Sequence, residues 1–175
     1  MSQMHHINIV FTGGTIEKIY DEVQGGIDNI ESWIDREFPP LRLPYVRLHS
    51  LRLMNIDSLQ MTDEHRQVIA QTIQRLQEDG RPIVITHGTD TMVDTGRYIK
   101  SHLPQIKVPI VLTGAMLPLV VQNSDGIQNL TEALFATKFL PAGIHIVFHN
   151  EVYDVDRVRK NRQAKTFERI ENSGQ

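Results

Sequence analysis

Residues 81–96 read RPIVITHGTDTMVDTG, and this stretch decides the fold. Three β-branched apolar residues, 83–85, predict a buried strand. A turn crowded with hydroxyl groups and one carboxylate follows at 87–91, and Thr91–Lys100 has the pattern of a helix. Because α/β sheets bind ligands where a buried strand ends in small polar groups at the start of a helix, this turn is a candidate site.

Two other predicted strands end in a similar way. Ile7–Phe11 runs into TGGT at 12–15, and Ile110–Leu112 runs into TGAM at 113–116. The carboxyl ends of parallel strands lie at one edge of their sheet. We therefore expect threonine and glycine residues from three separate segments to meet at that edge.

The rest of the chain alternates between strand and helix patterns. Apolar residues at helical spacing predict helices over Asp28–Glu37, from the N-cap Thr62 to about Glu78, and over Gln128–Phe139. Further strands are predicted over Tyr45–Leu53, Val108–Leu112, Gly143–Phe148 and Val152–Asp154, the last pairing back antiparallel, while residues 15–26 read as a polar loop. This order predicts an α/β fold with a single doubly wound, mostly parallel, flavodoxin-like sheet, helices on both faces and a short C-terminal hairpin.

Composition excludes several classes of protein. The 175 residues can form one domain with a real core, and the net charge of −3 argues against a nucleic-acid surface. The sequence holds no cysteine and no apolar run of about 18 residues, so it predicts neither disulfides nor a membrane span. The N-terminus lacks the pattern of a secretory signal, and we expect a cytoplasmic protein.

Nucleotide and zinc motifs are absent from the sequence. There is no GxxxxGK[ST], no GxGxxG and no HExxH. The predicted strand ends also carry few basic residues, which argues against a phosphate site. The predicted site is therefore one of hydroxyl, carboxylate and amide groups.

These motifs, taken in order, carry a resemblance. TGGTIEK at 12–18, HGTDTM at 87–92, LTGAM at 112–116 and NSDG at 123–126 resemble the L-asparaginase family of amidohydrolases. The resemblance covers almost all of residues 7–160 and corresponds to the family's N-terminal domain. It implies a single domain over 1–175, a short-chain bacterial member without the usual second domain.

The resemblance implies two catalytic groups. Thr15 would be the nucleophile that attacks the side-chain amide, and Tyr20 would correspond to the lid tyrosine that assists it. Thr89, Asp90 and Lys160 would form the second group. A threonine hydroxyl is a poor nucleophile until a neighbour takes its proton, which explains the need for such partners.

The resemblance also implies how substrate is bound. Asp90 would hold the α-ammonium group and Ser58 the α-carboxylate, while backbone N–H groups at Gly14 or Thr89 could hold the oxyanion. No metal or cofactor is required. Each residue also has a structural interpretation: Asp90 could cap a helix, and Lys160 lies in a charge run that would ordinarily be solvated. Asn123, Ser124 and Asp125 match the family, yet capping of a helix at Gly126 explains them sufficiently.

The function expected from the resemblance is hydrolysis of L-asparagine to L-aspartate and ammonia. Glutaminase or amidotransferase-type amide hydrolysis remains an alternative, and so does a non-catalytic module that binds an amino acid. We expect a small-molecule substrate, no nucleic-acid or membrane partner, and a homo-oligomer, either a dimer or a tetramer.

Overall fold

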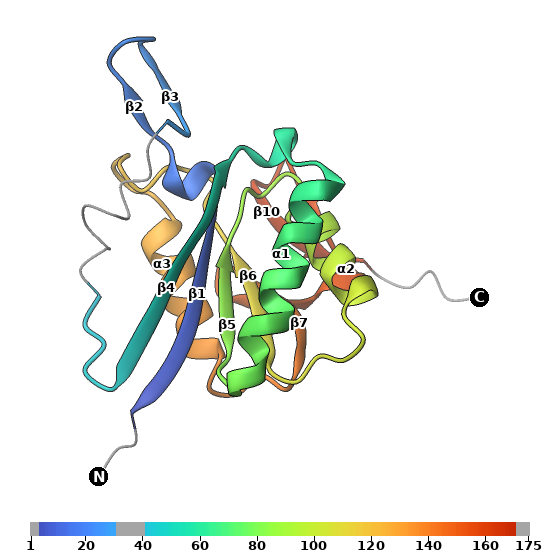
Figure 1. Ribbon diagram of the computed structural model, residues 1–175. Helices are drawn as coiled ribbons and strands as arrows, with labels where there is room; N and C mark the ends of the chain where they lie inside the picture. The colour runs from blue at the N-terminus through green and yellow to red at the C-terminus, as the bar shows by residue number, and fades with distance from the viewer. Residues whose placement is uncertain (1–3, 31–40, 171–175) are drawn as a thin grey trace.

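A six-stranded sheet forms the centre of the molecule in the computed structural model, which describes residues 4–30 and 41–170 (Figure 1). Its strand order is β4-β1-β5-β6-β7-β8, with β8 antiparallel and the other five parallel. The bounds are β1 (His5–Gly13), β4 (Val46–Ile56), β5 (Ile83–Thr86), β6 (Pro109–Thr113), β7 (Gly143–Phe148) and β8 (Glu151–Asp154). This is the flavodoxin-like order, as predicted.

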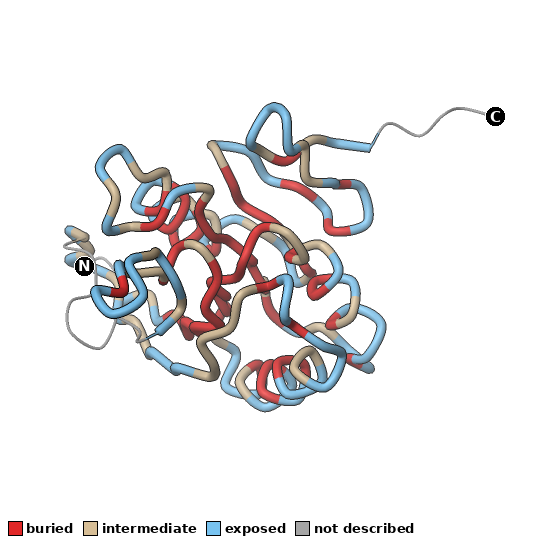
Figure 2. Tube along the Cα trace, turned by 90° about the horizontal axis from the view of Figure 1, so that it is seen from above, coloured by how far each residue is buried: buried red, intermediate tan, exposed pale blue. Residues whose placement is uncertain are grey.

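Helices cover both faces of the sheet. α1 (Asp63–Leu76) and α2 (Met92–His102) lie on one face, and α3 (Gly126–Ala136) lies on the other (Figure 1). Side chains alternate along each strand, so Ile83 and Ile85 pack toward α1 and α2 while Val84 packs toward α3. Figure 2 shows the buried strands at the centre and exposed surface around them. No helix in the described ranges is long and apolar enough to span a bilayer.

The segment predicted as a polar loop has structure of its own. A 3₁₀ turn at Thr15–Glu17 leads into a hairpin of β2 (Ile19–Asp21) and β3 (Gly26–Asp28). The turn between β2 and β3 forms because Asp21 Oδ1 accepts two backbone N–H groups and Gly25 takes a positive φ of 71°. The helix predicted over Asp28–Glu37 is wrong at its start, since Asp28 pairs in β3; its part over 31–37 lies outside the described residues.

The charged C-terminal segment forms a second hairpin. A 3₁₀ turn at Val155–Arg157 follows β8, and β9 (Val158–Asn161) then pairs antiparallel with β10 (Thr166–Arg169). Phe167 anchors β10: it is 2% exposed, and its ring centroid lies 5.1 Å from that of Phe148 in the main sheet. This hairpin places Lys160 at the carboxyl ends of the parallel strands.

Candidate active site

The strands β1 and β5 meet at the point where the direction of the sheet connections reverses. β1 connects onward to β4 on one side and β5 to β6 on the other, which is where doubly wound sheets open a crevice for ligands. Gly14 (φ 77°) follows β1, and a Cβ atom there would lie 2.2 Å from the backbone nitrogen of Gly88. The two backbones are therefore in contact, and Thr15 and Thr89, each the next residue, leave from the same edge.

Ser58 also lies against Gly88. It begins a 3₁₀ turn after β4, is 2% exposed, and its Oγ would be 2.4 Å from a Cβ placed on Gly88. The hydroxyl of Thr91 donates to the Ser58 carbonyl oxygen at 2.8 Å, which ties this turn to the start of α2. Only glycine at 88 allows the two segments to approach so closely.

Lys160 comes from β9 to the turn after β5. Its Nζ donates to Thr89 Oγ1 at 2.7 Å and to Asp90 Oδ1 at 3.0 Å, a contact between groups about 70 residues apart in sequence. The Lys160 side chain is only 16% exposed, so it is not a solvated member of the charge run. Thr89, Asp90 and Lys160 thus form one hydrogen-bonded cluster.

Two ion pairs at this edge have no counterpart in the sequence prediction. Arg162 Nη1 lies 2.6 Å from Asp90 Oδ1, so one carboxylate oxygen faces two cations. Lys18 Nζ lies 2.6 Å from Asp57 Oδ2. Burial raises the pKa of Asp57, but the hydrogen bonds from Lys18 and the Leu59 N–H, with the charges of Lys18 and Lys160, bring it below its ordinary value. Arg162 gave no signal because it lies in the charge-rich segment 157–162, where no single residue stands out.

Two of the predicted roles have no contact in the structure that tests them. The Gly14 N–H donates to the Ile56 carbonyl oxygen at 3.0 Å, which makes the Thr89 N–H the better candidate for the oxyanion, and the role of Gly14 stays a prediction. Tyr20 is 59% exposed on the hairpin β2–β3, which stands clear of the sheet (Figure 1). Within residues 4–30 and 41–170, no hydrogen bond joins Tyr20 to Thr15, so its lid role stays a prediction.

A cavity of about 470 Å³ lies beside Lys160, bounded by the loop 114–125 and by the turn between β9 and β10. Asp125 organises its wall by accepting hydrogen bonds from the backbone of Met116 and Leu117 and from His149 Nε2, at 2.9 to 3.0 Å. Burial raises the pKa of Asp125, but these donors bring it below its ordinary value. Asp125 is the N-cap residue of α3, as predicted, but its side chain makes no cap hydrogen bond and serves the loop instead.

His87 supports the turn that follows β5. It is fully buried, with Nδ1–H donating to the Gly88 carbonyl at 2.8 Å and Nε2 lying 3.0 Å from Met61 Sδ. Burial lowers the pKa of His87 to about 4, so the imidazole is neutral near pH 7. It serves as a rigid support for Gly88 and Thr89.

Comparison with known proteins identifies the family to which this chain is related. The sequence model of the family described as "Asparaginase, N-terminal" matches residues 6–173. The chain belongs to the asparaginase family. L-asparaginase 1 of Escherichia coli K12 is 32% identical to this asparaginase-family chain over 164 residues, which are 90% of this chain and 48% of the relative. The thermostable L-asparaginase of Thermococcus kodakarensis superposes with a TM-score of 0.79 and 26% identity, over 94% of this chain and 51% of that one.

A second kind of relative is also similar to this asparaginase-family chain. One component of the glutamyl-tRNA(Gln) amidotransferase of Methanococcus vannielii is 32% identical over 154 residues, covering 86% of this chain and 36% of the relative. The chain spans about half the length of the Escherichia coli L-asparaginases that it matches.

Proposed function

We propose that this chain hydrolyses L-asparagine to L-aspartate and ammonia, with Thr15 as nucleophile and no metal or cofactor. The observation that carries the proposal is the cluster in which Lys160 Nζ donates to both Thr89 and Asp90, beside the contact of Gly14 with Gly88. A carboxamide bound at the carboxyl ends of these strands would face the hydroxyls of Thr15 and Thr89 and the ammonium group of Lys160.

The proposed reaction has two steps. Thr15 Oγ attacks the carboxamide carbon, a C–O bond forms, and the C–N bond breaks as ammonia leaves with the hydroxyl proton. Water then cleaves the resulting ester, which releases aspartate and restores the Thr15 hydroxyl. Thr89 and Lys160 form the path along which the proton moves, and Tyr20 assists Thr15 once substrate is bound.

The charged and polar groups at the carboxyl ends of the strands would recognise the substrate. Asp90 would hold the α-ammonium group, since a carboxylate is the natural partner of an amine. Ser58 would donate to the α-carboxylate. The backbone N–H of Thr89 would hold the oxyanion and so lower the free energy of the transition state by about 3 kcal/mol.

Release of ammonia from asparagine tests the proposal. We expect Thr15→Ala to abolish release, and Lys160→Met to lower kcat by about 10²–10⁴-fold because proton transfer is lost. Lys165→Met is the matched control, because Lys165 lines the neighbouring cavity and, within the described ranges, forms no hydrogen bond with Thr89 or Asp90. Equal activity in the wild-type protein and in Thr15→Ala would reject the mechanism.

The amidotransferase relative favours one second candidate, hydrolysis of glutamine as an ammonia source. Rates on asparagine and glutamine, measured side by side, separate the two substrates. Calorimetric binding of asparagine without any ammonia release would instead identify a binding module that has no catalytic activity.

A further inference from the structure

Helix α2 meets the proposed site twice. Its N-terminus follows directly on Thr89 and Asp90, with Thr91 as the N-cap residue. Its later turns contact the chain segment between β8 and β9, which leads to Lys160. One helix therefore adjoins both chain segments that carry the partners of the Lys160–Thr89 hydrogen bond.

Arg97 makes the more specific of these contacts. Its Nε donates to the Val155 carbonyl at 3.2 Å and its Nη2 to the Val158 carbonyl at 3.4 Å. These carbonyls belong to the first residue of the 3₁₀ turn and to the first residue of β9, and a planar guanidinium with fixed donors holds both together. In residues 4–30 and 41–170 Arg97 has no ion pair with a carboxylate, so its guanidinium is committed to these backbone groups.

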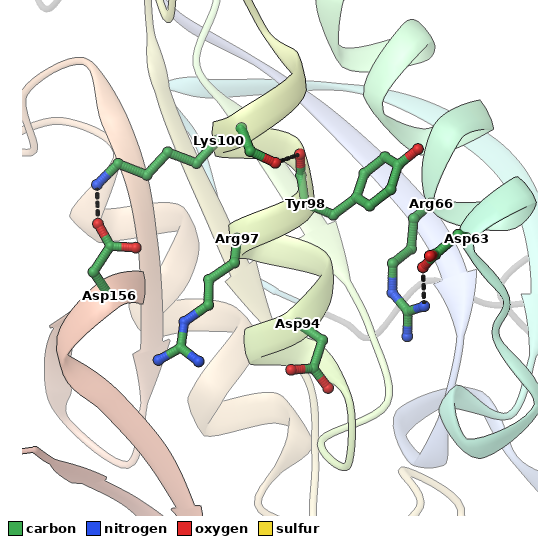
Figure 3. Close-up of a pocket in the computed structure, with 8 residues that line it drawn as sticks. Asp63, Arg66, Asp94, Arg97, Tyr98, Lys100 and Asp156 are labelled. Carbon is green, nitrogen blue, oxygen red and sulfur yellow. Dashed lines mark hydrogen bonds and ion pairs between the residues drawn. The ribbon is translucent and has the colours of Figure 1, made fainter.

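Two neighbours of Arg97 on α2 lie close to the same segment, but neither bonds the backbone of β9. A Cβ on Gly96 would lie 2.5 Å from Val155 Cγ2, so the helix and the turn are in close contact there. Lys100, one helical turn further on, pairs with Asp156, and this hydrogen bond raises the pKa of the Lys100 amine above its ordinary value. Figure 3 shows Lys100 reaching from α2 to Asp156, with Arg97 beside it, on the wall of an open cavity of about 670 Å³.

The distance from this contact to Lys160 is short. Val158 and Lys160 are two residues apart in β9, so their side chains lie on the same face of the strand and their Cα atoms about 7 Å apart. Val158 is fully buried, and a displacement of its carbonyl would carry Lys160 with it. A shift of about 1 Å at a reacting group can cost about a hundredfold in rate.

We propose that Arg97 is a positioning residue, which fixes β9 through the Val155 and Val158 carbonyls so that the Lys160 ammonium stays within hydrogen-bond distance of Thr89 and Asp90. This inference rests on the proposed function for its effect on rate. Lys100 provides the matched control, because an exposed ion pair on the same helix contributes little and bonds a side chain rather than the backbone of β9.

The experiment compares Arg97→Met, Arg97→Lys and Lys100→Met in the full chain. It measures kcat and KM for asparagine and the ¹⁵Nζ resonance of Lys160, assigned with Lys160→Met. Arg97→Met should lower kcat by about tenfold with KM within about twofold. It should also shift the Lys160 resonance, because the ammonium group moves from its place beside Thr89 and Asp90. Arg97→Lys should recover part of the loss, and Lys100→Met should match the wild-type protein.

Two results would overturn the proposal: an unchanged Lys160 resonance in Arg97→Met, or a shifted resonance with unchanged kcat. Melting curves of all three variants show whether a lower kcat reflects loss of fold, and the conservative Arg97→Lys variant gives a second test if Arg97→Met is unstable. If the wild-type protein releases no ammonia, the proposed function fails by itself, and the resonance still reports whether Arg97 positions Lys160.

Discussion

At the scale of single residues, two glycines and one histidine shape the site. Gly14 lets the end of β1 touch the end of β5, and Gly88 lets the Ser58 turn close over the same point. The threonines beside these glycines could be predicted from the sequence, because small residues after buried strands indicate a ligand edge. The roles of Arg162 and Arg97 could not, since their partners depend on how distant segments meet.

Gly14→Ala should destabilise the protein by at least about 2 kcal/mol, because the new methyl group would meet the Gly88 backbone at a residue with φ 77°. Gly26→Ala is the control, since a Cβ there has no neighbour within 4 Å. Urea unfolding of both variants at pH 7 makes the comparison. Equal midpoints would show that the two strand ends are not in contact.

Acid should weaken the fold through His87. Its pKa is about 4 in the folded protein, against about 6.5 in the unfolded chain, so the unfolded state binds the proton first. The stability that the fold gains by keeping His87 neutral is fully present above pH 6.5. It is lost as the pH falls toward 4, by about 3 kcal/mol in total. Unfolding in urea at pH 7 and pH 4 should show a smaller loss for His87→Gln, while His102→Gln, on the exposed end of α2, should behave like the wild-type protein.

At the scale of elements, prediction succeeded where the signal is local. Thr62 and Gly80 mark the two ends of the α1 region in the sequence, and the structure begins α1 after Thr62 and closes the segment at Gly80 with φ 74°. The hairpin β9–β10 was missed because half of the residues in its strands are charged. Its main apolar anchors, Val158 and Phe167, pack against β7 and β8, and a local pattern carries no sign of such distant contacts.

Phe167→Ala should cost about 3–5 kcal/mol, because it removes a buried ring that packs on Phe148 and Tyr153. It should also reduce amide hydrolysis, since β10 holds the strand that carries Lys160. Val152→Ala on β8, where the side chain is 39% exposed, should change stability by less than about 1 kcal/mol. Thermal melts decide the matter, and similar losses in both variants would contradict the role given to Phe167.

At the scale of the whole molecule, the sheet order and both helical layers followed from the order of elements in the sequence. Parallel strands joined through helices have few allowed arrangements, so topology is better determined than any single contact. The hairpins β2–β3 and β9–β10 are the exceptions, since short strands outside the main sheet give little periodic signal.

The open edge of the sheet also bears on assembly. We expect the protein to form a homodimer or homotetramer, because a site at the rim of one small domain gains cover from a neighbouring copy. Light scattering coupled to gel filtration should give the mass of two or four chains. A single-chain mass at assay concentrations, with full activity, would refute this expectation.

The hydrogen bond from Lys160 to Thr89 spans 71 residues, and this separation affects the nascent protein. During translation, a chain emerges from the ribosome with its N-terminal segments first. Thr15, Thr89 and Asp90 are therefore exposed to the cell before Lys160 leaves the exit tunnel. A half-made chain would hold the hydroxyls and the carboxylate without their ammonium, so under the proposed mechanism it would be inactive until the hairpin β9–β10 has docked.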